Sequence, residues 1–375
     1  MARMARNSAA REKRRSVAPF HLAILDGLRK GCDVPSVCAQ ERIHDIRERG
    51  SKRPVHVIVT DGDDPRCQDA VKLLLRETAN MSLRITLLTH GSAIAKETWM
   101  HSSNVSIVAP EDDPQLRVLA DAYRDARIRA GKAAPSREDA YRAVATNEMY
   151  AAMLLITGRA DGMLGGASVP TARVLQAGLQ IVGLRPGRSV VSGAFAMMFR
   201  EPLAGGQEVV AFADCAVVPF PTARQLMEIA LNTSEIMRDI LHIDPVVAFL
   251  SFSTKHSAKH DSLDKIQEAV ALVRQTQPEL IVDGELQADA AIVPEVAWSK
   301  DPGGVIDGHA NVLIFPDLNA ANISYKLVQR TSGSMALGVV LSGFAKPVND
   351  LSRGCSVDDI ADMICVTSLQ ADDPR

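Results

Sequence analysis

Residues 346–359 read Lys-Pro-Val-Asn-Asp-Leu-Ser-Arg-Gly-Cys-Ser-Val-Asp-Asp. The apolar run before them, residues 336–341, predicts a buried strand, and the helical spacing over residues 360–365 predicts a helix. The polar stretch therefore lies between a strand end and a helix start, where unpaired backbone N–H groups favour anion binding. Its Ser-Arg-Gly sequence can offer a phosphate group a hydroxyl, a forked cation and a close approach to the backbone.

Asp359 admits two interpretations. At the helical rise it lies about two turns beyond Ser352, so its carboxylate could face the same cleft as the Ser352 hydroxyl. Alternatively, Ser356 is a good N-cap residue, and Asp358 and Asp359 then lie in the first helical turn, where acids favour the helix dipole. Spacing alone leaves both interpretations open.

Length and composition narrow the class of protein. The chain has 375 residues, which predicts a large core and two domains. A net charge of −3 argues against a nucleic-acid binder, and no apolar run approaches the ~20 residues of a membrane helix. The six cysteines are scattered without zinc-site spacing, which favours a reducing cytoplasm.

The N-terminal residues 1–17 are basic and predict a disordered tail, with a transit peptide or an anion-binding arm as alternatives. Residues 20–30 have the apolar spacing of an amphipathic helix, and 31–53 could form a helical connector.

Short apolar runs alternate with helical patterns along the rest of the chain. This alternation predicts parallel βαβ units and an α/β fold. Expected strands are 55–59, 84–88, 105–108, 190–198, 208–213, 246–252, 281–283 and 312–314. Expected helices are 69–80, 114–130, 141–157, 222–241 capped by Thr222, 262–276 and 322–329, with another opening at Thr171. The small residues of 160–166 predict a turn.

Several longer motifs precede the 346–359 stretch. They occupy residues 61–66, 159–163, 191–198, 212–216, 250–255, 283–287 and 310–316. Together, and in this order, they make residues 55–369 resemble the phosphate acetyl/butyryltransferase family, and within it the phosphate acetyltransferases. One such motif is weak evidence, whereas this number is specific.

The resemblance implies two α/β domains with mainly parallel sheets flanked by helices and an active site in the interdomain cleft. The first domain is expected over residues 18–188 plus 346–375, and the second over 189–345. The implied enzyme moves an acetyl group between coenzyme A and phosphate and forms a cytoplasmic homodimer. Coenzyme A is then a substrate, no cofactor is permanently bound, and neither a metal, a nucleic acid nor a membrane is needed.

The resemblance also assigns roles in the terminal motif. Asp359 is the expected base for the thiol proton, Ser352 the donor to the acyl or phosphate oxygen, and Arg353 the cation that neutralises phosphate. A structural salt bridge from Arg353 to Asp350 or Asp358 is the alternative. Transfer is direct in the family, so Cys355 is expected to line the site as a packing residue.

Other expected substrate-binding residues lie elsewhere in the chain. Arg127, with Arg129 as the near alternative, matches a family arginine that precedes a glycine on a helix. Tyr325 and Lys326 fall in a helix-opening family motif and are expected on the phosphate and coenzyme A side of the cleft.

Residues 165–176 depart from the family pattern. Thr171 is retained, but the family arginine falls on Gln176, and Arg173 one turn earlier could reach the same anion. This departure leaves two alternatives: transfer of another short acyl group such as propionyl or butyryl, or a catalytically weak protein that senses acyl-CoA or acyl phosphate.

A dehydrogenase is disfavoured because no Gly-x-Gly-x-x-Gly follows the first strand.

Overall fold

The computed structural model describes residues 37–49, 51, 53–77, 83–90, 102–129 and 131–372. The expected basic tail at 1–17 and the expected helix at 20–30 lie outside these residues. Within the 31–53 connector, α3 (Val37–Arg49) is helical.

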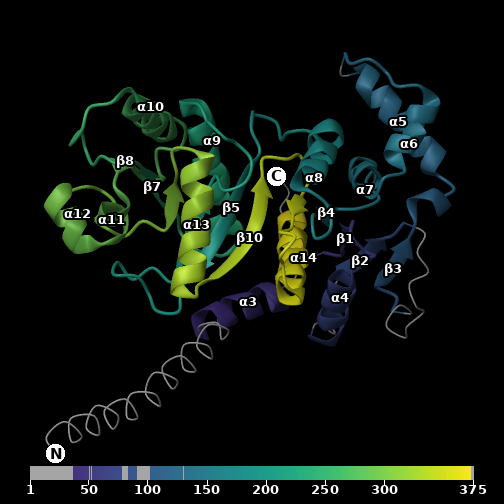
Figure 1. Ribbon diagram of the computed structural model, residues 1–375, viewed down its shortest axis with the longest axis horizontal. Helices are drawn as coiled ribbons and strands as arrows, with labels where there is room; N and C mark the ends of the chain where they lie inside the picture. Colours follow the sequence, from purple (N-terminus) through teal and green to yellow (C-terminus); the bar gives the residue numbers. More distant parts are fainter. Residues whose placement is uncertain are drawn as a thin grey trace, which may run out of the picture.

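The first sheet has five parallel strands in the order β11-β4-β1-β2-β3 (Figure 1). Their bounds are β1 (Val55–Val59), β2 (Leu83–Leu88), β3 (Val105–Val108), β4 (Gly162–Gly165) and β11 (Val348–Asp350). The expectation of parallel βαβ units is confirmed here.

The expected turn at 160–166 is wrong, because these residues contain β4, which pairs with both β1 and β11. Its glycines are needed for close packing. A Cβ atom on Gly162 would lie 2.6 Å from the Thr367 methyl group, and one on Gly165 would lie 2.4 Å from the Thr60 hydroxyl. Small residues here reflect a crowded strand rather than a bend.

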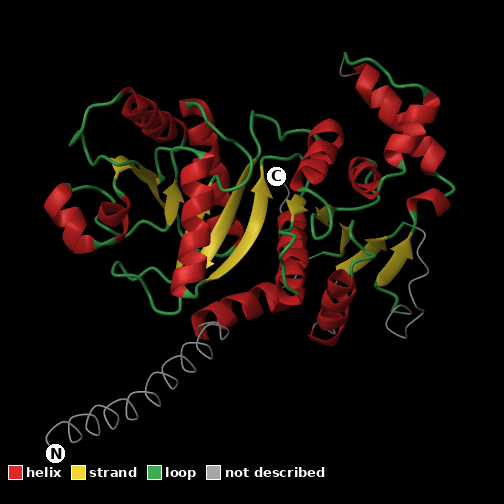
Figure 2. Cartoon of the chain, viewed as in Figure 1, coloured by secondary structure: helices red, strands yellow, loops and turns green. Residues whose placement is uncertain are grey.

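Among the described residues, several α-helices accompany the first sheet and are drawn in red in Figure 2. They are α3, α4 (Pro65–Glu77), α5 (Leu116–Arg129), α6 (Arg137–Val144), α7 (Asn147–Ile156), α8 (Thr171–Ala177) and α14 (Val357–Asp372). The single helix expected at 141–157 is wrong. Thr146 has extended backbone angles at the N-cap position of α7, and its hydroxyl donates back to the Ala143 carbonyl at 2.8 Å instead of to α7, so the helical path is interrupted there.

The second sheet is mixed and has the order β10-β5-β6-β9-β7-β8. Its strands are β5 (Ser192–Met198), β6 (Val209–Ala213), β7 (Val246–Leu250), β8 (Ile281–Leu286), β9 (Val312–Ile314) and β10 (Met335–Ser342). The pairs β10–β5 and β5–β6 are antiparallel and the other three are parallel. The expectation of two α/β units with mainly parallel sheets is confirmed.

The helices around the second sheet are α9 (Ala223–Glu235), α10 (Asp261–Thr276), α11 (Ala288–Ile292), α12 (Pro294–Lys300) and α13 (Leu318–Ser332). Thr222 caps α9 as expected, in a reciprocal pair with Gln225. The continuous helix expected up to residue 241 instead ends in a wider turn, η4 (Ile236–Ile240).

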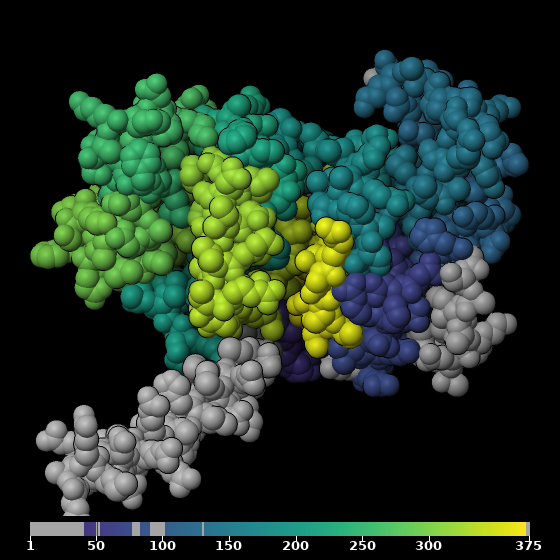
Figure 3. All heavy atoms as spheres, in the orientation of Figure 1, coloured from purple at the N-terminus to yellow at the C-terminus, as the bar shows by residue number. Residues whose placement is uncertain are grey.

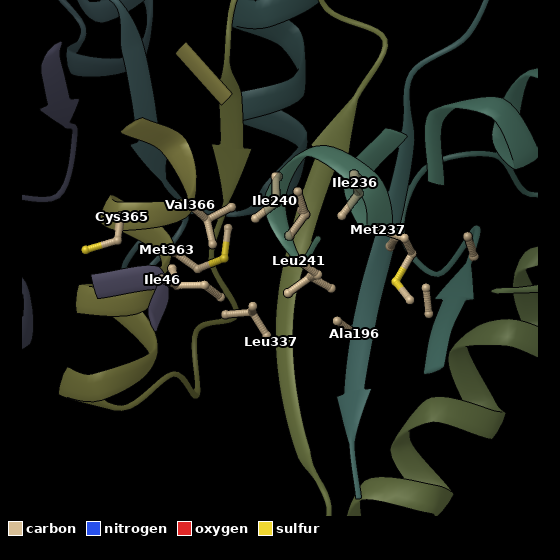
Figure 4. Packing of buried hydrophobic residues seen from close by; sticks show 14 of the residues in the cluster. Ile46, Ala196, Ile236, Met237, Ile240, Leu241, Leu337, Met363, Cys365 and Val366 are labelled. Carbon is tan, nitrogen blue, oxygen red and sulfur yellow. The ribbon is translucent and has the colours of Figure 1, made fainter. Parts of the chain in front are cut away.

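A buried apolar junction joins the two halves. Figure 4 shows Met363 and Val366 of α14 and Ile46 of α3 on one side, with Leu337 of β10 and Ile240 of η4 on the other. All five side chains are almost fully buried. The helix α14 therefore covers the first sheet while it also packs against the second.

Candidate active site

Three loops converge at the carboxyl edge of the first sheet: residues 60–66 after β1, 166–171 after β4, and 351–356 after β11. The chain proceeds from β1 to β2 and β3 on one side and then returns to β4 on the other. The gap between β1 and β4 is therefore the point where strand order reverses, which is the usual ligand position in open α/β sheets.

Asp61 fastens the first loop to the second. Its carboxylate accepts hydrogen bonds from the backbone N–H of Gly166 at 2.9 Å and of Ser168 at 3.0 Å, and from the Thr60 hydroxyl at 3.2 Å. Burial raises the pKa of the Asp61 carboxyl, while these three bonds act in the opposite direction.

Arg66 fastens the third loop. One guanidinium nitrogen, Nη1, donates to the carbonyls of Arg353 and Cys355, each at 2.9 Å, and Nη2 donates to the Ala167 carbonyl at 2.8 Å. The same guanidinium pairs with Asp64 at 2.7 Å, and its hydrogen bond holds the pKa of that carboxyl down at about 2. Arg66 thus links all three loops.

Sequence reasoning missed Arg66 as a site residue. The available signal was its place in the 61–66 motif, directly after a buried strand. Its partners follow it by about 100 and 290 positions, so the sequence alone does not reveal them.

Ser352, Arg353, Cys355 and Asp359 are brought together by a turn rather than by one helix. The Cys355 N–H donates to the Ser352 carbonyl at 2.9 Å, and α14 begins only at Val357. The expected helical rise from Ser352 to Asp359 is therefore wrong, although both residues remain on the same short segment.

Asp359 and Ser356 cap α14. The Asp359 carboxylate accepts the Ser356 N–H at 2.8 Å through Oδ2, and the Asp359 N–H donates to the Ser356 hydroxyl at 3.1 Å. The capping interpretation is therefore correct in geometry. The second carboxylate oxygen of Asp359 makes no hydrogen bond to any described residue, so a role in proton transfer is compatible with the cap.

Arg353 is exposed, and its guanidinium has no ion pair within the described part of the chain. Both carboxylates that were considered as salt-bridge partners bind elsewhere. Asp350 is hydrogen-bonded to the Thr171 hydroxyl at 2.6 Å, and Asp358 pairs with Arg47 at 3.0 Å. The salt-bridge alternative for Arg353 is therefore wrong.

Cys355 is buried beneath the loop, with Sγ 3.8 Å from Arg66 Nη1. Burial raises the pKa of its thiol to about 11, and the Arg66 charge offsets only part of this effect. The side chain is therefore a neutral thiol near neutral pH, which is unsuited to nucleophilic attack.

Thr171 and Arg173 lie on α8, next to the third loop. The Thr171 hydroxyl reaches Asp350, two positions before Ser352. Arg173 pairs with the buried Glu148 at 2.9 Å, so its guanidinium is anchored toward α7.

Comparison with known proteins agrees with this arrangement. The family described as phosphate acetyl/butaryl transferase matches residues 42–368. The phosphate acetyltransferase of Clostridium acetobutylicum is 38% identical over 331 residues, covering 88% of this chain and 98% of that protein. The Bacillus subtilis phosphate acetyltransferase is 37% identical over 326 residues, covering 87% and 98%.

A solved phosphotransacetylase from Streptococcus pyogenes superposes with a TM-score of 0.78 at 36% identity, covering 88% of this chain and 98% of that structure. The chain belongs to the phosphate acetyl/butyryl transferase family. The resemblance inferred from the sequence motifs is thereby confirmed.

Other residues expected from this transferase family lie apart from the 352–359 segment. Arg127 donates through Nε to the Ala133 carbonyl at 3.1 Å, on a helix that packs against α6 and α7 at the far end of the molecule from α13 (Figure 1). Tyr325 stacks on Phe195 of β5 at 4.1 Å, and Lys326 Nζ lies 4.9 Å from the Tyr325 ring. Among the described residues, none of the three contacts the 352–359 segment.

The transferase fold also contains cavities away from this segment. One of about 290 Å³ lies where residues 341–347 cross between the sheets, and one of about 460 Å³ lies beyond the ends of β7 and β9. Neither is lined by Ser352, Arg353 or Asp359.

Within the ranges that the structure covers, no group of three His, Cys, Asp or Glu side chains is arranged to hold a metal ion. No helix in those ranges has both the length and the apolar content to span a membrane.

Proposed function

We propose that this member of the family transfers an acetyl group between coenzyme A and phosphate, with the reaction centred on residues 352–359. The observation that carries the proposal is a loop clamped by Arg66 that leaves the Ser352 hydroxyl and the Arg353 guanidinium exposed. The loop lies before the N-terminus of the 16-residue α14, which adds a favourable dipole for an anion.

Each reacting group has a candidate partner. In the proposed step, Asp359 takes the thiol proton of coenzyme A, and the thiolate attacks the carbonyl carbon of acetyl phosphate. The Ser352 hydroxyl donates to the developing oxyanion, and Arg353 holds the phosphate. As the C–S bond forms and the C–O bond breaks, phosphate leaves with the bonding electrons.

Substrate contacts from both halves of the molecule complete the proposal. We assign the domains as 18–188 plus 346–375 and 189–345, with Cys355, Thr171 and Arg173 beside the loop. Tyr325 and Lys326 would approach from the second domain, and Arg127 from the far end of the first. Closure of the cleft on coenzyme A, a substrate rather than a bound cofactor, would bring Tyr325 and Lys326 toward the loop.

The test is thioester formation from coenzyme A and a panel of acetyl, propionyl and butyryl phosphates. Acetyl phosphate is expected to give the highest kcat/KM. A higher kcat/KM for propionyl or butyryl phosphate would show that the enzyme prefers a longer acyl group. No turnover of any of the three by folded protein would favour the sensing alternative. That alternative has one supporting observation, the anchoring of Arg173 to Glu148 beside the uncharged Gln176.

We also propose a cytoplasmic homodimer that needs no nucleic acid or membrane. Ile323 and Leu327 lie one turn apart on α13 and are 57% and 58% exposed. The helix α13 lies at the surface on the face shown in Figure 3. A paired apolar face of this kind suits a second copy of the chain. Cys67, Cys215 and Cys355 are free thiols, which fits a reducing compartment.

A further inference from the structure

Asp350 is a buried carboxyl that the proposed mechanism does not use. It is the last residue of β11 and only 2% exposed. Its Oδ2 lies 2.6 Å from the Thr171 hydroxyl, whereas its Oδ1 is buried with no hydrogen-bond partner in the described residues. Ionising Asp350 would be costly, because Oδ1 has no hydrogen-bond donor and the favourable effects of the Thr171 hydroxyl and the Leu351 backbone N–H are smaller than the penalty of burial.

The backbone closes over the unpartnered oxygen. A Cβ atom on Gly166 would lie 2.2 Å from Asp350 Oδ1, and Gly166 has a φ of +100° that favours glycine. The absence of a side chain lets the β4 loop cover Asp350 directly. Burial raises the pKa of Asp350 to about 7, and the nearby charge of Asp61 acts in the same direction.

The charged groups on neighbouring elements are occupied elsewhere. On α8, Arg173 pairs with Glu148, and on α14, Asp362 pairs with Arg47 while Asp359 caps the helix. Asp61 accepts three hydrogen bonds, as an ionised carboxylate does. Two buried carboxyls in one site favour a proton on one of them, and Asp350 has the fewer donors.

We propose that Asp350 is a positioning residue whose protonated form donates to Thr171 and thereby turns the Thr171 hydroxyl hydrogen toward the substrate anion. The 2.6 Å separation suits a hydrogen bond in either direction. When Asp350 is ionised, the Thr171 hydroxyl must donate to it and offers an anion only lone pairs. When Asp350 is protonated, Thr171 accepts that proton's hydrogen bond and donates its own hydrogen outward. This inference rests on the proposed function through the use of acyl phosphate as the ligand.

The test measures acetyl phosphate binding by calorimetry without coenzyme A, so that no turnover occurs. For wild-type protein, Kd is expected to rise about tenfold from about pH 6 to about pH 8.5, the typical effect of losing one donor to a charged group. Binding near neutral pH should take up protons, detected as a dependence of the binding heat on the buffer.

Asp350→Asn supplies a permanent amide donor to Thr171, so its Kd should stay nearly constant over that range, with less proton uptake than wild type. Thr171→Val should bind about tenfold more weakly at the lower pH and show little further change. Thr171→Ser should behave like wild type. Subtracting the pH profile of Kd for Asp350→Asn from that of wild type removes the contribution from the ionisation of acetyl phosphate itself.

Asp362→Asn is the matched control, since Asp362 is another buried carboxyl with a pKa of about 7. It should retain the wild-type pH dependence of binding. The same pH dependence in wild type and Asp350→Asn, or wild-type affinity in Thr171→Val, would overturn the inference. If Asp350→Asn does not fold, proton uptake by Thr171→Val decides: uptake equal to that of wild type overturns the inference, and reduced uptake supports it.

The outcomes also separate this inference from the proposed function. If the variants bind acetyl phosphate as expected but the protein forms no thioester, the role of Asp350 is supported and the transferase function is contradicted. If the enzyme is active but wild type and all variants bind acetyl phosphate independently of pH, the transferase function is supported and the role of Asp350 is contradicted. No binding of acetyl phosphate at either pH would overturn both.

Discussion

Asp359 is bonded to the Ser356 N–H, and in the proposed mechanism it also takes the thiol proton. Asp359→Asn keeps an acceptor for the cap but removes the base. We expect kcat to fall about 10²–10⁴-fold, with KM for acetyl phosphate near the wild-type value. Steady-state assays measure kcat and KM, and thermal unfolding shows whether the variant is folded.

Asp358→Asn is the control. The carboxylate of Asp358 is adjacent in the sequence to that of Asp359, but it pairs with Arg47 and its side chain is 70% exposed. It should retain wild-type kcat. If Asp359 serves only the helix dipole, Asp359→Asn would cost under ~1 kcal/mol of stability and little rate. Wild-type kcat in folded Asp359→Asn would remove it from the mechanism.

Arg353 has an exposed guanidinium and a backbone carbonyl fixed by Arg66. Arg353→Gln should raise the KM for acetyl phosphate and lower kcat, since the charge is used both in binding and as the transition state develops. Arg353→Lys should recover only part of the loss, because lysine keeps the charge but not the fork. Full recovery by lysine would show that geometry at this position is unimportant.

Cys355 is expected to be dispensable for chemistry. Cys355→Ala should keep substantial activity, because the attacking thiolate belongs to coenzyme A and the protein thiol has a pKa of about 11. Mass spectrometry of enzyme quenched during turnover provides the independent check. An acetyl group on Cys355 would contradict direct transfer.

At the scale of single residues, the sequence predicts site residues that lie close together in the chain better than residues whose contacts are distant in the chain. The segment 352–359 could be identified because its polar residues lie in one short run. Arg66 could not, because its function comes from carbonyls at Ala167, Arg353 and Cys355 that only the fold brings near. Whether the predicted site residues act as assigned stays a prediction.

A buried ion pair contributes to the packing of α3 against α14. Arg47 donates to Asp362 at 2.7 Å, and the two side chains are 11% and 4% exposed. Burial raises the pKa of Asp362 to about 7, while Arg47 opposes this. The stabilisation from the raised pKa is fully present below the ordinary carboxyl pKa and is lost as pH rises through 7.

Arg47→Met should therefore be destabilising mainly above neutral pH. With the arginine gone, the pKa of Asp362 rises further, so the variant should lose about 1.4 kcal/mol more stability at about pH 8, one unit above the wild-type pKa, than at about pH 5, where Asp362 is protonated in both proteins. Urea unfolding at about pH 5 and about pH 8 measures the difference. Replacing Asp362 by leucine in the same chain should restore stability, and equal losses at both pH values would contradict this account.

At the scale of elements, periodicity predicted the strands better than it predicted breaks. β9 has the bounds expected from its apolar run, 312–314. β4 was mistaken for a turn because glycine is read as flexibility, whereas here it permits contact with Thr60 and Thr367. The break between α6 and α7 follows from the extended backbone of Thr146, which the apolar pattern around it does not reveal.

Across the whole molecule, the exposed α13 face gives a test of assembly. Leu327→Glu places a charge on the proposed interface, so light scattering should show a shift from dimer to monomer. Val118→Glu on α5 is the control, since Val118 is also an apolar helix residue, 65% exposed, far from α13 in Figure 1. A wild-type monomer, or an unchanged Leu327→Glu dimer, would contradict this interface.

The arrangement of the two halves was the part least accessible from sequence. The α/β class and the two units followed from the alternation of apolar runs and from the motifs. The antiparallel pair β10–β5 did not, because the direction of these two strands depends on pairing across a long stretch of chain. The separation of Tyr325 and Lys326 from the 352–359 segment likewise depends on how α13 packs against its own sheet.

The late position of β11 in the chain has a consequence for synthesis on the ribosome. All six strands of the second sheet come from the continuous stretch 192–342, but the first sheet takes its edge strand from residues 348–350 and its cover from α14. A nascent chain can therefore finish its second half while β4 still has an open edge and the apolar surface beneath α14 is bare. Such edges and surfaces invite association between chains. The half of the protein that is translated first is thus the half whose sheet is completed last.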